Sequence, residues 1–469
     1  MHDDRRHHNV TLGILTLAGA AFALQQTMVF PALPTFQDEL GGSTAWVTWV
    51  LTGFLVSAAV TTPILGRLGD QFGKERMLLV SLSIFLAGCV GAAAAWNIWS
   101  LIAFRVLAGA GGALFPLSFA IIRDELPPER VKVGIGLLSA VWGVGGGFGI
   151  VLSGVIVDNF SWRWLFVLGS IPIAASILLV HRFVPESPVR SPSRVDVPGA
   201  LLLSGALLSL MVALTEGEDW GWSSPLLLGT AAASAAFFVL WGLFELRTTS
   251  PMVDMRMLGH RPVLLTNGAT MVSGFALFSC FVLLPAFVAT DSRRGYGFDA
   301  TATEAGLFLL PSSVAMLFAG PAAGMIGRRL GSKWALAGGM FVVGVAAVMF
   351  AGAHDEAWHV LVASGLLGLG VGAAFAAMAA LIADNVDALE MGVASGMNTV
   401  VRMIGAVIGG QVGAALLTAK TIGSSSVPAE SAFTTTFALS AVAALIAAGI
   451  AVSIGSPPLR RLEPVQARR

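Results

Sequence analysis

The chain has 469 residues, of which 56% are hydrophobic and only 12% are charged, and its mean hydropathy is +0.82. Soluble domains carry about 25% charged residues, so this composition excludes a soluble protein and indicates an integral membrane protein. The 27 basic and 27 acidic residues balance to a net charge of zero, which gives no reason to expect a nucleic acid as a partner.

Long apolar segments follow one another along the whole chain. A helix needs roughly 20 mostly apolar residues to cross a bilayer, and its backbone polar groups are then satisfied internally. We predict fourteen spanning helices and therefore an all-α integral membrane fold. Their cores are residues 10 to 31, 46 to 66, 77 to 96, 98 to 122, 132 to 156, 164 to 183, 197 to 215, 224 to 246, 262 to 289, 303 to 327, 334 to 352, 359 to 383, 391 to 418 and 433 to 454.

The basic residues predict the orientation of these spans. An even number of spans places both termini on one side of the bilayer. If that side is the cytoplasm, 21 of the 27 basic residues lie inside, four lie outside, and two, Arg105 and Arg402, fall within spans. Lys and Arg favour cytoplasmic loops. We therefore predict a multi-pass protein of the cell inner (plasma) membrane with cytoplasmic N- and C-termini.

Two stretches of the first half of the chain recur in the second half. GRLGDQFGKERML (66 to 78) follows the second span, and GMIGRRLGSKWAL (324 to 336) follows the tenth, with glycines at matching steps. The fourth span also overlays the twelfth at an offset of 260 residues, which pairs Asp124 with Asp384. These matches indicate two related six-helix halves.

The remaining two spans are then an insertion between the halves. We predict an N-terminal six-helix bundle (1 to 185), two inserted helices with their linkers (186 to 255) and a C-terminal six-helix bundle (256 to 469). Repeated halves that meet at a central site are a transporter architecture, in which one half rocks against the other.

These motifs resemble the major facilitator superfamily, and specifically its fourteen-helix drug:proton antiporters. GRLGDQFGKERML is similar to the family's loop signature, and LIAFRVLAGAGGA (101 to 113) is similar to its fourth-helix motif, with Arg105 as the membrane arginine. LTEGEDWGWSSP (214 to 225) resembles the turn between the two extra helices. The resemblance implies proton-coupled efflux of small amphipathic, drug- or antibiotic-like molecules by alternating access.

The resemblance also implies a charge latch that closes the cytoplasmic face. Asp70, Lys74 and Asp124 are its charged members, and Gly66 and Gly73 are expected to allow a tight turn beside them. A carboxylate near a helix N-terminus is stabilised by about 0.3 to 1 kcal/mol, so we expect Asp70 to cap a neighbouring helix.

Two positions depart from the family pattern. The fifth span has the glycine motif Gly145, Gly149 and Gly154, which favours close helix packing, but it lacks the proline that usually follows a glycine there. The first span has Gln25 where the drug antiporters usually carry an aspartate. A glutamine does not exchange protons, and the 27 acidic residues all fall in loops or at the ends of spans.

The polar groups that remain within spans predict a substrate cavity. An arginine at the bilayer centre costs about 2.5 to 3.5 kcal/mol and therefore needs a partner or a wet cavity. We expect the central cavity to combine these arginines with amides and apolar surface. Its predicted lining is Gln25, Gln26, Arg105, Trp142, Met271, Phe375, Asn398 and Arg402.

Other functions remain open at this point. An importer or facilitator of an organic acid or other nutrient explains the missing carboxylate equally well, and a non-transporting membrane sensor is a further alternative. We expect no enzyme activity, because the spans contain no nucleophile and base pair and no metal cluster. We also expect no cofactor, a small-molecule substrate and a monomer in the bilayer.

Overall fold

The computed structural model describes residues 2–29, 32–41, 44–187, 196–249, 251, 253–422 and 428–455. Every regular element in these ranges is a helix, as predicted. In chain order they are α1 (His2–Thr27), α2 (Leu33–Leu40), α3 (Thr44–Phe72), α4 (Lys74–Ala93), α5 (Ile98–Ala108), the 3-10 helix η2 (Gly109–Ala113), α6 (Leu114–Glu125), α7 (Pro128–Asn159), α8 (Arg163–Phe183), α9 (Val197–Trp220), α10 (Pro225–Glu245), α11 (Met255–Gly259), α12 (Arg261–Val288), η3 (Ser292–Arg294), α13 (Ala302–Arg329), α14 (Ser332–Gly352), α15 (Ala357–Asn385), η4 (Ala388–Glu390), α16 (Met391–Ala419) and α17 (Glu430–Ser453).

The long helices coincide with the predicted spans. Within the described residues, 13 helical segments are long and apolar enough to cross a membrane. The remaining predicted span, 132 to 156, lies inside α7, a helix of 32 residues in which the side chains of 142 to 144, 146 and 147 fall outside the described set. The count of fourteen spans therefore stays a prediction.

The sequence predicts one continuous helix for the fourth span, but the structure shows a break in it. It consists of α5, η2 and α6, and the 3-10 turn coincides with the run Gly109–Ala113. A Cβ at Gly109 would lie 2.7 Å from the Phe54 carbonyl oxygen, and one at Gly112 would lie 2.8 Å from the Thr62 hydroxyl oxygen. Glycine has a low intrinsic preference for the α-helix, so this run departs from it easily. Its close packing against α3 then determines the local geometry.

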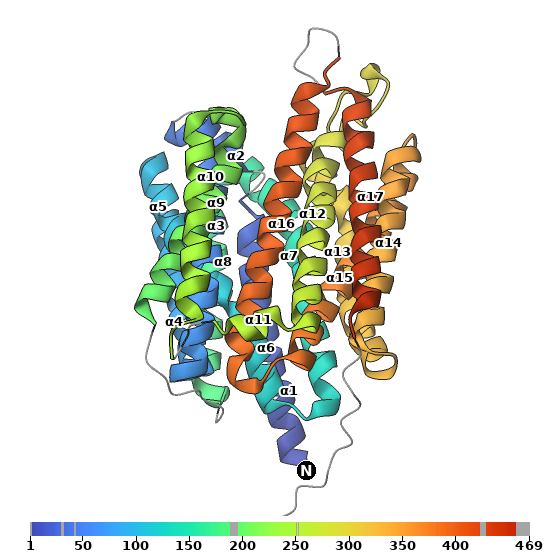
Figure 1. Cartoon of the computed structure of the whole chain (residues 1–469). Coiled ribbons are helices and arrows are strands. Elements are labelled where there is room, and N and C mark those ends of the chain that lie inside the picture. Colours follow the sequence, from blue (N-terminus) through green and yellow to red (C-terminus); the bar gives the residue numbers. More distant parts are fainter. Residues whose placement is uncertain are drawn as a thin grey trace, which may run out of the picture.

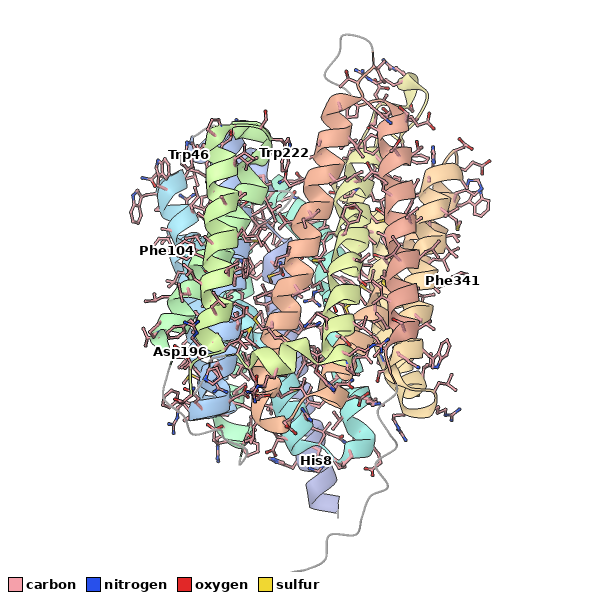
Figure 2. All side chains as sticks on the ribbon, in the orientation of Figure 1. His8, Trp46, Phe104, Asp196, Trp222 and Phe341 are labelled. Atoms are coloured by element: carbon pink, nitrogen blue, oxygen red, sulfur yellow. The ribbon has the colours of Figure 1, made fainter. Side chains whose placement is uncertain are left out.

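The helices form two bundles that stand side by side (Figure 1). The first bundle has an apolar core that includes Phe22, Phe85 and Phe115, and the core of the second includes Phe287 and Phe437. The end of the molecule at which α1 begins is called the basic face below, because the predicted topology places most Lys and Arg there. Trp46 and Trp222 lie toward the opposite end (Figure 2), where amphipathic rings suit a membrane interface.

The glycine motif of α7 packs directly on α1. A Cβ at Gly145 or Gly149 would overlap Ala23 or Thr27 of α1. The second bundle has glycines at the equivalent positions, since Gly405 and Gly409 of α16 lie 260 residues after Gly145 and Gly149. They pack on α12 in the same way. This shared packing supports the interpretation of two related halves, and the boundaries at 185 and 255 stay a prediction.

Gly154 has a different environment from the other two glycines of the motif. Its Cβ position lies 3.1 Å from the hydroxyl oxygen of Thr303, on α13 of the other bundle. At Gly154, α7 thus faces the seam between the halves rather than α1.

Among the helix pairs that join the halves, α3 with α16 and α7 with α13 approach each other most closely at glycines. A Cβ on Gly66 of α3 would lie 2.6 Å from the Gly392 carbonyl oxygen of α16. Gly136 of α7 and Gly320 of α13 approach each other in the same manner. Because the backbones touch at these glycines, the seams are closed on their basic-face side.

The inserted pair, α9 and α10, covers the seam between α3 and α16. Leu203 and Leu207 of α9 join an apolar cluster with Val393 and Val400 of α16, and Met211 lies with residues of both α3 and α16. At its other end, α9 is tied to α3, because Trp49 Nε1 donates a hydrogen bond to Glu216 Oε1 at 2.7 Å.

Candidate functional site

Asp70 lies at the basic face and does cap a helix, but the helix belongs to the other half. Its Oδ1 accepts a hydrogen bond from the Gly392 amide at 3.2 Å, and its Oδ2 accepts one from the Val393 amide at 3.1 Å. These amides belong to the first turn of α16, where N–H groups have no partner within the helix. The carboxylate thus joins α3 to α16 through backbone donors and the helix dipole.

Lys74 and Asp124 form an ion pair inside the first half. Their side chains are 0% and 1% exposed, so the pair is shielded from solvent. The Ser187 hydroxyl also donates a hydrogen bond to Asp124. Removing one partner of a buried pair typically costs about 3 to 5 kcal/mol. This pair therefore holds the start of α4 against the end of α6.

Glu186 completes this cluster, and sequence reasoning missed it. Its carboxylate accepts hydrogen bonds from the Glu75 and Arg76 amides at 3.2 and 3.3 Å, which caps the N-terminus of α4. Gly73 has φ of +119°, and a Cβ there would overlap the Glu186 carboxylate. The sequence carries no signal for this contact, because the partners lie about 110 residues apart.

The second half repeats the turn with different charges. Gly331 has φ of +102°, and the next residue, Ser332, donates a hydrogen bond to Asp384 at 2.9 Å, as Lys74 does to Asp124. The charged partner of Asp384 is Lys132 from α7 of the first half, at 2.8 Å. A charged contact thus joins the two halves here as well.

Other contacts reinforce this face. Arg123 of α6 donates a hydrogen bond to the Val386 carbonyl oxygen at 2.6 Å. Burial, and then the nearby carboxylate of Asp254, raise the pKa of Glu390, which immediately precedes α16, although Arg67 opposes this shift. The basic face is therefore closed by several polar contacts between the halves.

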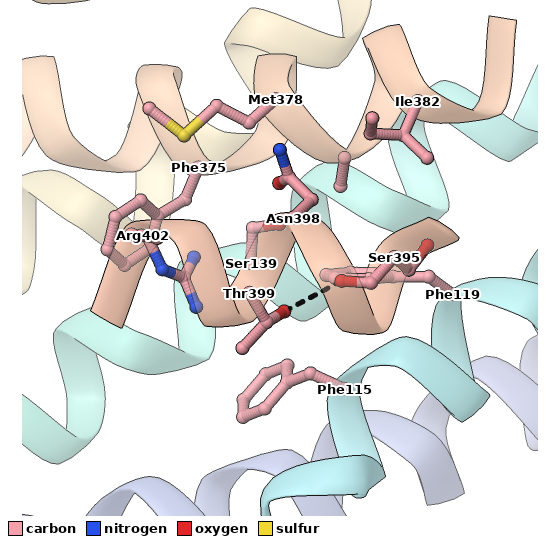
Figure 3. Close-up of a pocket in the computed structure, with 11 residues that line it drawn as sticks. Phe115, Phe119, Ser139, Phe375, Met378, Ile382, Ser395, Asn398, Thr399 and Arg402 are labelled. Atoms are coloured by element: carbon pink, nitrogen blue, oxygen red, sulfur yellow. Dashed lines mark hydrogen bonds between the residues drawn. The ribbon is translucent and has the colours of Figure 1, made fainter. Parts of the chain in front are cut away.

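A small cavity lies between the two halves (Figure 3). Its lining comes from α6 and α7 of the first half and from α15 and α16 of the second, and it consists of Phe115, Phe119, Ser139, Phe375, Met378, Ala379, Ile382, Ser395, Asn398, Thr399 and Arg402. The cavity has a volume of only about 10 Å³, which is close to the minimum for one water molecule. Sites for drug-sized ligands measure roughly 300 to 1,000 Å³, so the halves must separate to admit such a ligand.

Phe375, Asn398 and Arg402 were predicted as cavity residues, and all three line this cavity. The guanidinium carbon of Arg402 lies 4.3 Å from the Phe375 ring centroid, in a cation–π contact. Asn398 Nδ2 donates hydrogen bonds to Asn267 Oδ1 and Thr270 Oγ1, both at 2.9 Å. Asn398 therefore also fixes α16 against α12.

The predicted first-half residues lie elsewhere. Gln25 is fully buried and points at Gly169 of α8, whose Cβ would overlap its amide oxygen. Arg105 is also buried, its Nε donates to the Val50 carbonyl oxygen at 3.2 Å, and its guanidinium covers the Phe54 ring at 4.3 Å. Both amide atoms of Gln25 and both terminal nitrogens of Arg105 lack a hydrogen-bond partner within the described residues.

Their assignment to a substrate cavity stays a prediction. Gln26 is buried and its Oε1 also lacks a partner among the described residues, whereas Met271 is 40% exposed and its carbonyl oxygen lies against Gly405. Neither they nor Gln25 and Arg105 are among the described lining residues. The side chain of Trp142 falls outside the described set.

Comparisons with known proteins give one family. The Major Facilitator Superfamily model matches residues 15–410 and 266–468. The lincomycin resistance protein of Streptomyces lincolnensis is 32% identical over 465 residues, which cover 97% of this chain and 93% of that protein. The tetracenomycin C resistance and export protein of Streptomyces glaucescens is 29% identical over 412 residues, which cover 85% of this chain and 73% of that protein.

A solved structure has the same fold. The human organic anion transporter MFSD10 (TETRAN) superimposes with a TM-score of 0.68 over 96% of this chain and 99% of that one, at 15% sequence identity. With a family match over most of its length, two helical halves and a cavity between them, this chain is a multi-pass membrane protein that belongs to the Major Facilitator Superfamily.

Proposed function

We propose that this protein is a secondary-active exporter of small amphipathic organic molecules, driven by the proton gradient, and that it works by alternating access. The cavity that both halves line carries this proposal, because its closed volume requires the halves to part. The names of the two bacterial relatives, which describe antibiotic resistance and export, support efflux as the direction.

The latch is proposed to hold the basic face closed in this conformation. Gly66, Asp70, Gly73, Lys74 and Asp124 all belong to it by their contacts. Gly66 and Asp70 act directly between the halves, whereas Gly73, Lys74 and Asp124 shape the turn that presents Asp70. When the latch opens, the cavity faces the cytoplasm.

The cavity is proposed to hold the substrate. Phe375, Asn398 and Arg402 line it in this conformation, and Gln25, Gln26, Arg105, Trp142 and Met271 are proposed to join the lining when the halves separate. The unpaired atoms of Gln25 and Arg105 are consistent with this, because a buried polar atom without a partner costs about 1 to 3 kcal/mol until it is satisfied.

The protein is proposed to lie in the inner (plasma) membrane as a monomer, with the basic face and both termini in the cytoplasm. This placement follows the excess of Lys and Arg on that side. In this proposal, substrate from the cytoplasm is exchanged for protons from the opposite side of the membrane.

Flux into inverted membrane vesicles tests this function. In such vesicles the basic face is outside, so an exporter should concentrate a fluorescent amphiphile in the lumen when the lumen is acidic. We expect uptake to stop when an ionophore collapses the pH gradient. Vesicles without the protein, and vesicles that carry Gly66→Leu, serve as controls. Uptake that is independent of the gradient in the wild type would rule out proton-driven export.

The missing first-helix carboxylate favours a second candidate, a facilitator of an organic acid or other nutrient. With Gln25 in that position, transport needs no proton exchange on the first helix. The same experiment distinguishes the two, since a facilitator only equilibrates its substrate across the membrane.

A further inference from the structure

The closed cavity is positively charged. Arg402 is the one ionisable side chain among its eleven described lining residues, and the others carry rings, aliphatic groups, hydroxyls or an amide. A guanidinium stays protonated in proteins. Whatever enters this space therefore meets a fixed positive charge.

The position of Arg402 sets how that charge is presented. The guanidinium carbon of Arg402 lies over the Phe375 ring, 4.3 Å from its centroid, and the two side chains lie side by side in Figure 3. Stacking uses the face of a guanidinium, whereas its N–H groups lie in the plane and form a fork that matches a carboxylate. The contact with Phe375 thus holds this donor fork at the cavity.

Ser139 offers a second donor from the opposite half. It lies on α7, is 1% exposed and lines the same cavity, and its Oγ has no hydrogen-bond partner among the described residues. A serine in a buried helix commonly donates to the carbonyl four residues earlier, as Ser170 and Ser273 do here at 2.7 and 2.6 Å. The unused hydroxyl of Ser139 is available to a ligand.

From these two donors we infer that the cavity binds the anionic oxygens of amphipathic organic acids, a carboxylate or an acidic phenol, between Arg402 and Ser139. Phe115, Phe119 and Phe375 cover the apolar body of the ligand. Because the donors belong to different halves, a bound anion draws α16 toward α7. Lipophilic cations are excluded by the same charge. This inference rests on the proposed function for the location of the substrate.

Binding to the purified, full-length protein in detergent tests this inference without requiring transport. The probes are 2-naphthoate, its uncharged methyl ester and a naphthyl trimethylammonium salt, which share one ring system and differ in charge. We expect the wild type to bind naphthoate about tenfold or more tightly than the other two, as loss of one charge-assisted pair predicts.

Variants then assign the donors. Arg402→Gln should reduce the affinity for naphthoate by about tenfold and leave the affinity for the ester unchanged. Arg402→Lys should reduce the naphthoate affinity by less, because lysine keeps the charge but lacks the fork of donors. Ser139→Ala should reduce the naphthoate affinity by about two- to fivefold, as expected for the loss of one hydrogen bond. Arg293→Gln, at an exposed arginine outside the cavity, is the matched control. If Arg402→Gln does not fold, Arg402→Lys and Ser139→Ala still test whether these two side chains bind the anion.

The inference is overturned if the wild type binds the three probes equally, prefers the cation, or does not bind naphthoate, or if Arg402→Gln retains naphthoate affinity. The flux experiment has separate outcomes. A wild type that exports without a preference for anions contradicts this inference alone, whereas a wild type that binds naphthoate without proton-driven flux contradicts the proposed coupling alone.

Discussion

The carboxylate of Asp70 on α3 accepts a hydrogen bond from the backbone amide of Val393 on α16, at 3.1 Å. The residues are 323 positions apart in the chain, and they belong to different halves. A single side chain of the first half thus caps a helix of the second half, and the contact exists only while the two helices meet.

Asp70→Asn should open the basic face. The amide keeps one acceptor but loses the charge that the helix dipole favours by about 0.3 to 1 kcal/mol, and up to about 2 kcal/mol when partly buried. The open state should gain population accordingly. A cysteine in place of the cavity residue Ser395 reports this change through its labelling rate with a membrane-impermeant thiol reagent, because the native Cys89 and Cys280 are buried.

Glu129→Gln is the control for this experiment, because Glu129 is an exposed acidic residue in the first turn of α7. Glu129→Gln removes a charge near a helix N-terminus but does not remove a hydrogen bond that joins the two halves. Equal labelling rates in Asp70→Asn and the parent would contradict a gating role for Asp70.

Gly66→Leu should prevent the basic face from closing. Even a Cβ at this position would lie 2.6 Å from the Gly392 carbonyl oxygen, and overpacking of this kind costs about 1 to 3 kcal/mol. We expect flux to fall by about tenfold or more while the thermal unfolding temperature stays near that of the parent, since the clash is between halves rather than within one. Gly338→Leu, where a Cβ meets nothing within 4 Å, should transport normally.

Lys74→Met should destabilise the first half. It leaves the Asp124 carboxylate buried without its cation, and breaking a buried ion pair in this way costs about 3 to 5 kcal/mol. The double variant Lys74→Met with Asp124→Leu should recover part of that loss, because neither charge of the pair then remains buried. Thermal unfolding of the four proteins in detergent gives the coupling energy, and a coupling near zero would show that the pair is not structurally important.

Glu390 should make the stability of the fold sensitive to pH. Its folded-state pKa is raised from 4.5 by burial and by Asp254, so its charged form destabilises the fold. This penalty is complete above the raised pKa, declines as the pH falls through that value, and disappears below about 4.5, where the unfolded chain is protonated as well. The wild type should therefore gain stability on mild acidification.

Glu390→Gln tests this dependence. The variant should unfold at a higher temperature than the wild type at neutral pH, and the difference should shrink as the pH approaches 4.5. Asp355→Asn, at an exposed acid of the opposite end, should not change the pH dependence. A constant difference between Glu390→Gln and the wild type across the pH range would exclude titration of Glu390 as the cause.

The spans and the repeats were predictable from the sequence for definite reasons. A bilayer requires long apolar helices, and the runs that we identified coincide with the described helices. The repeat that pairs Asp124 with Asp384 reappears as geometry, since each acid is bound by the residue that follows a glycine with positive φ. Asn398 and Arg402, whose spacing places them on one helix face, both line the cavity, and their role in substrate binding stays a prediction.

The lining from the first half was not predictable in the same way. Gln25 and Arg105 stand out in the sequence because polar groups are rare in spans, whereas Ser139 is an ordinary serine in a small-residue helix. Which face of α1 or α7 meets the seam depends on how the helices rotate against their neighbours. Gly145 and Gly149 set that rotation by their contacts with α1, and these contacts are visible only in three dimensions.

By itself, the sequence determined that this protein is helical, embedded in a membrane and built from two related halves, because hydropathy and internal repetition are local properties of the chain. Only the tertiary structure decided that Asp70 caps α16, that Glu186 caps α4, and that Ser139 and Arg402 face one cavity from opposite halves. These contacts join segments far apart in sequence, so they depend on helix packing, which apolar periodicity does not encode.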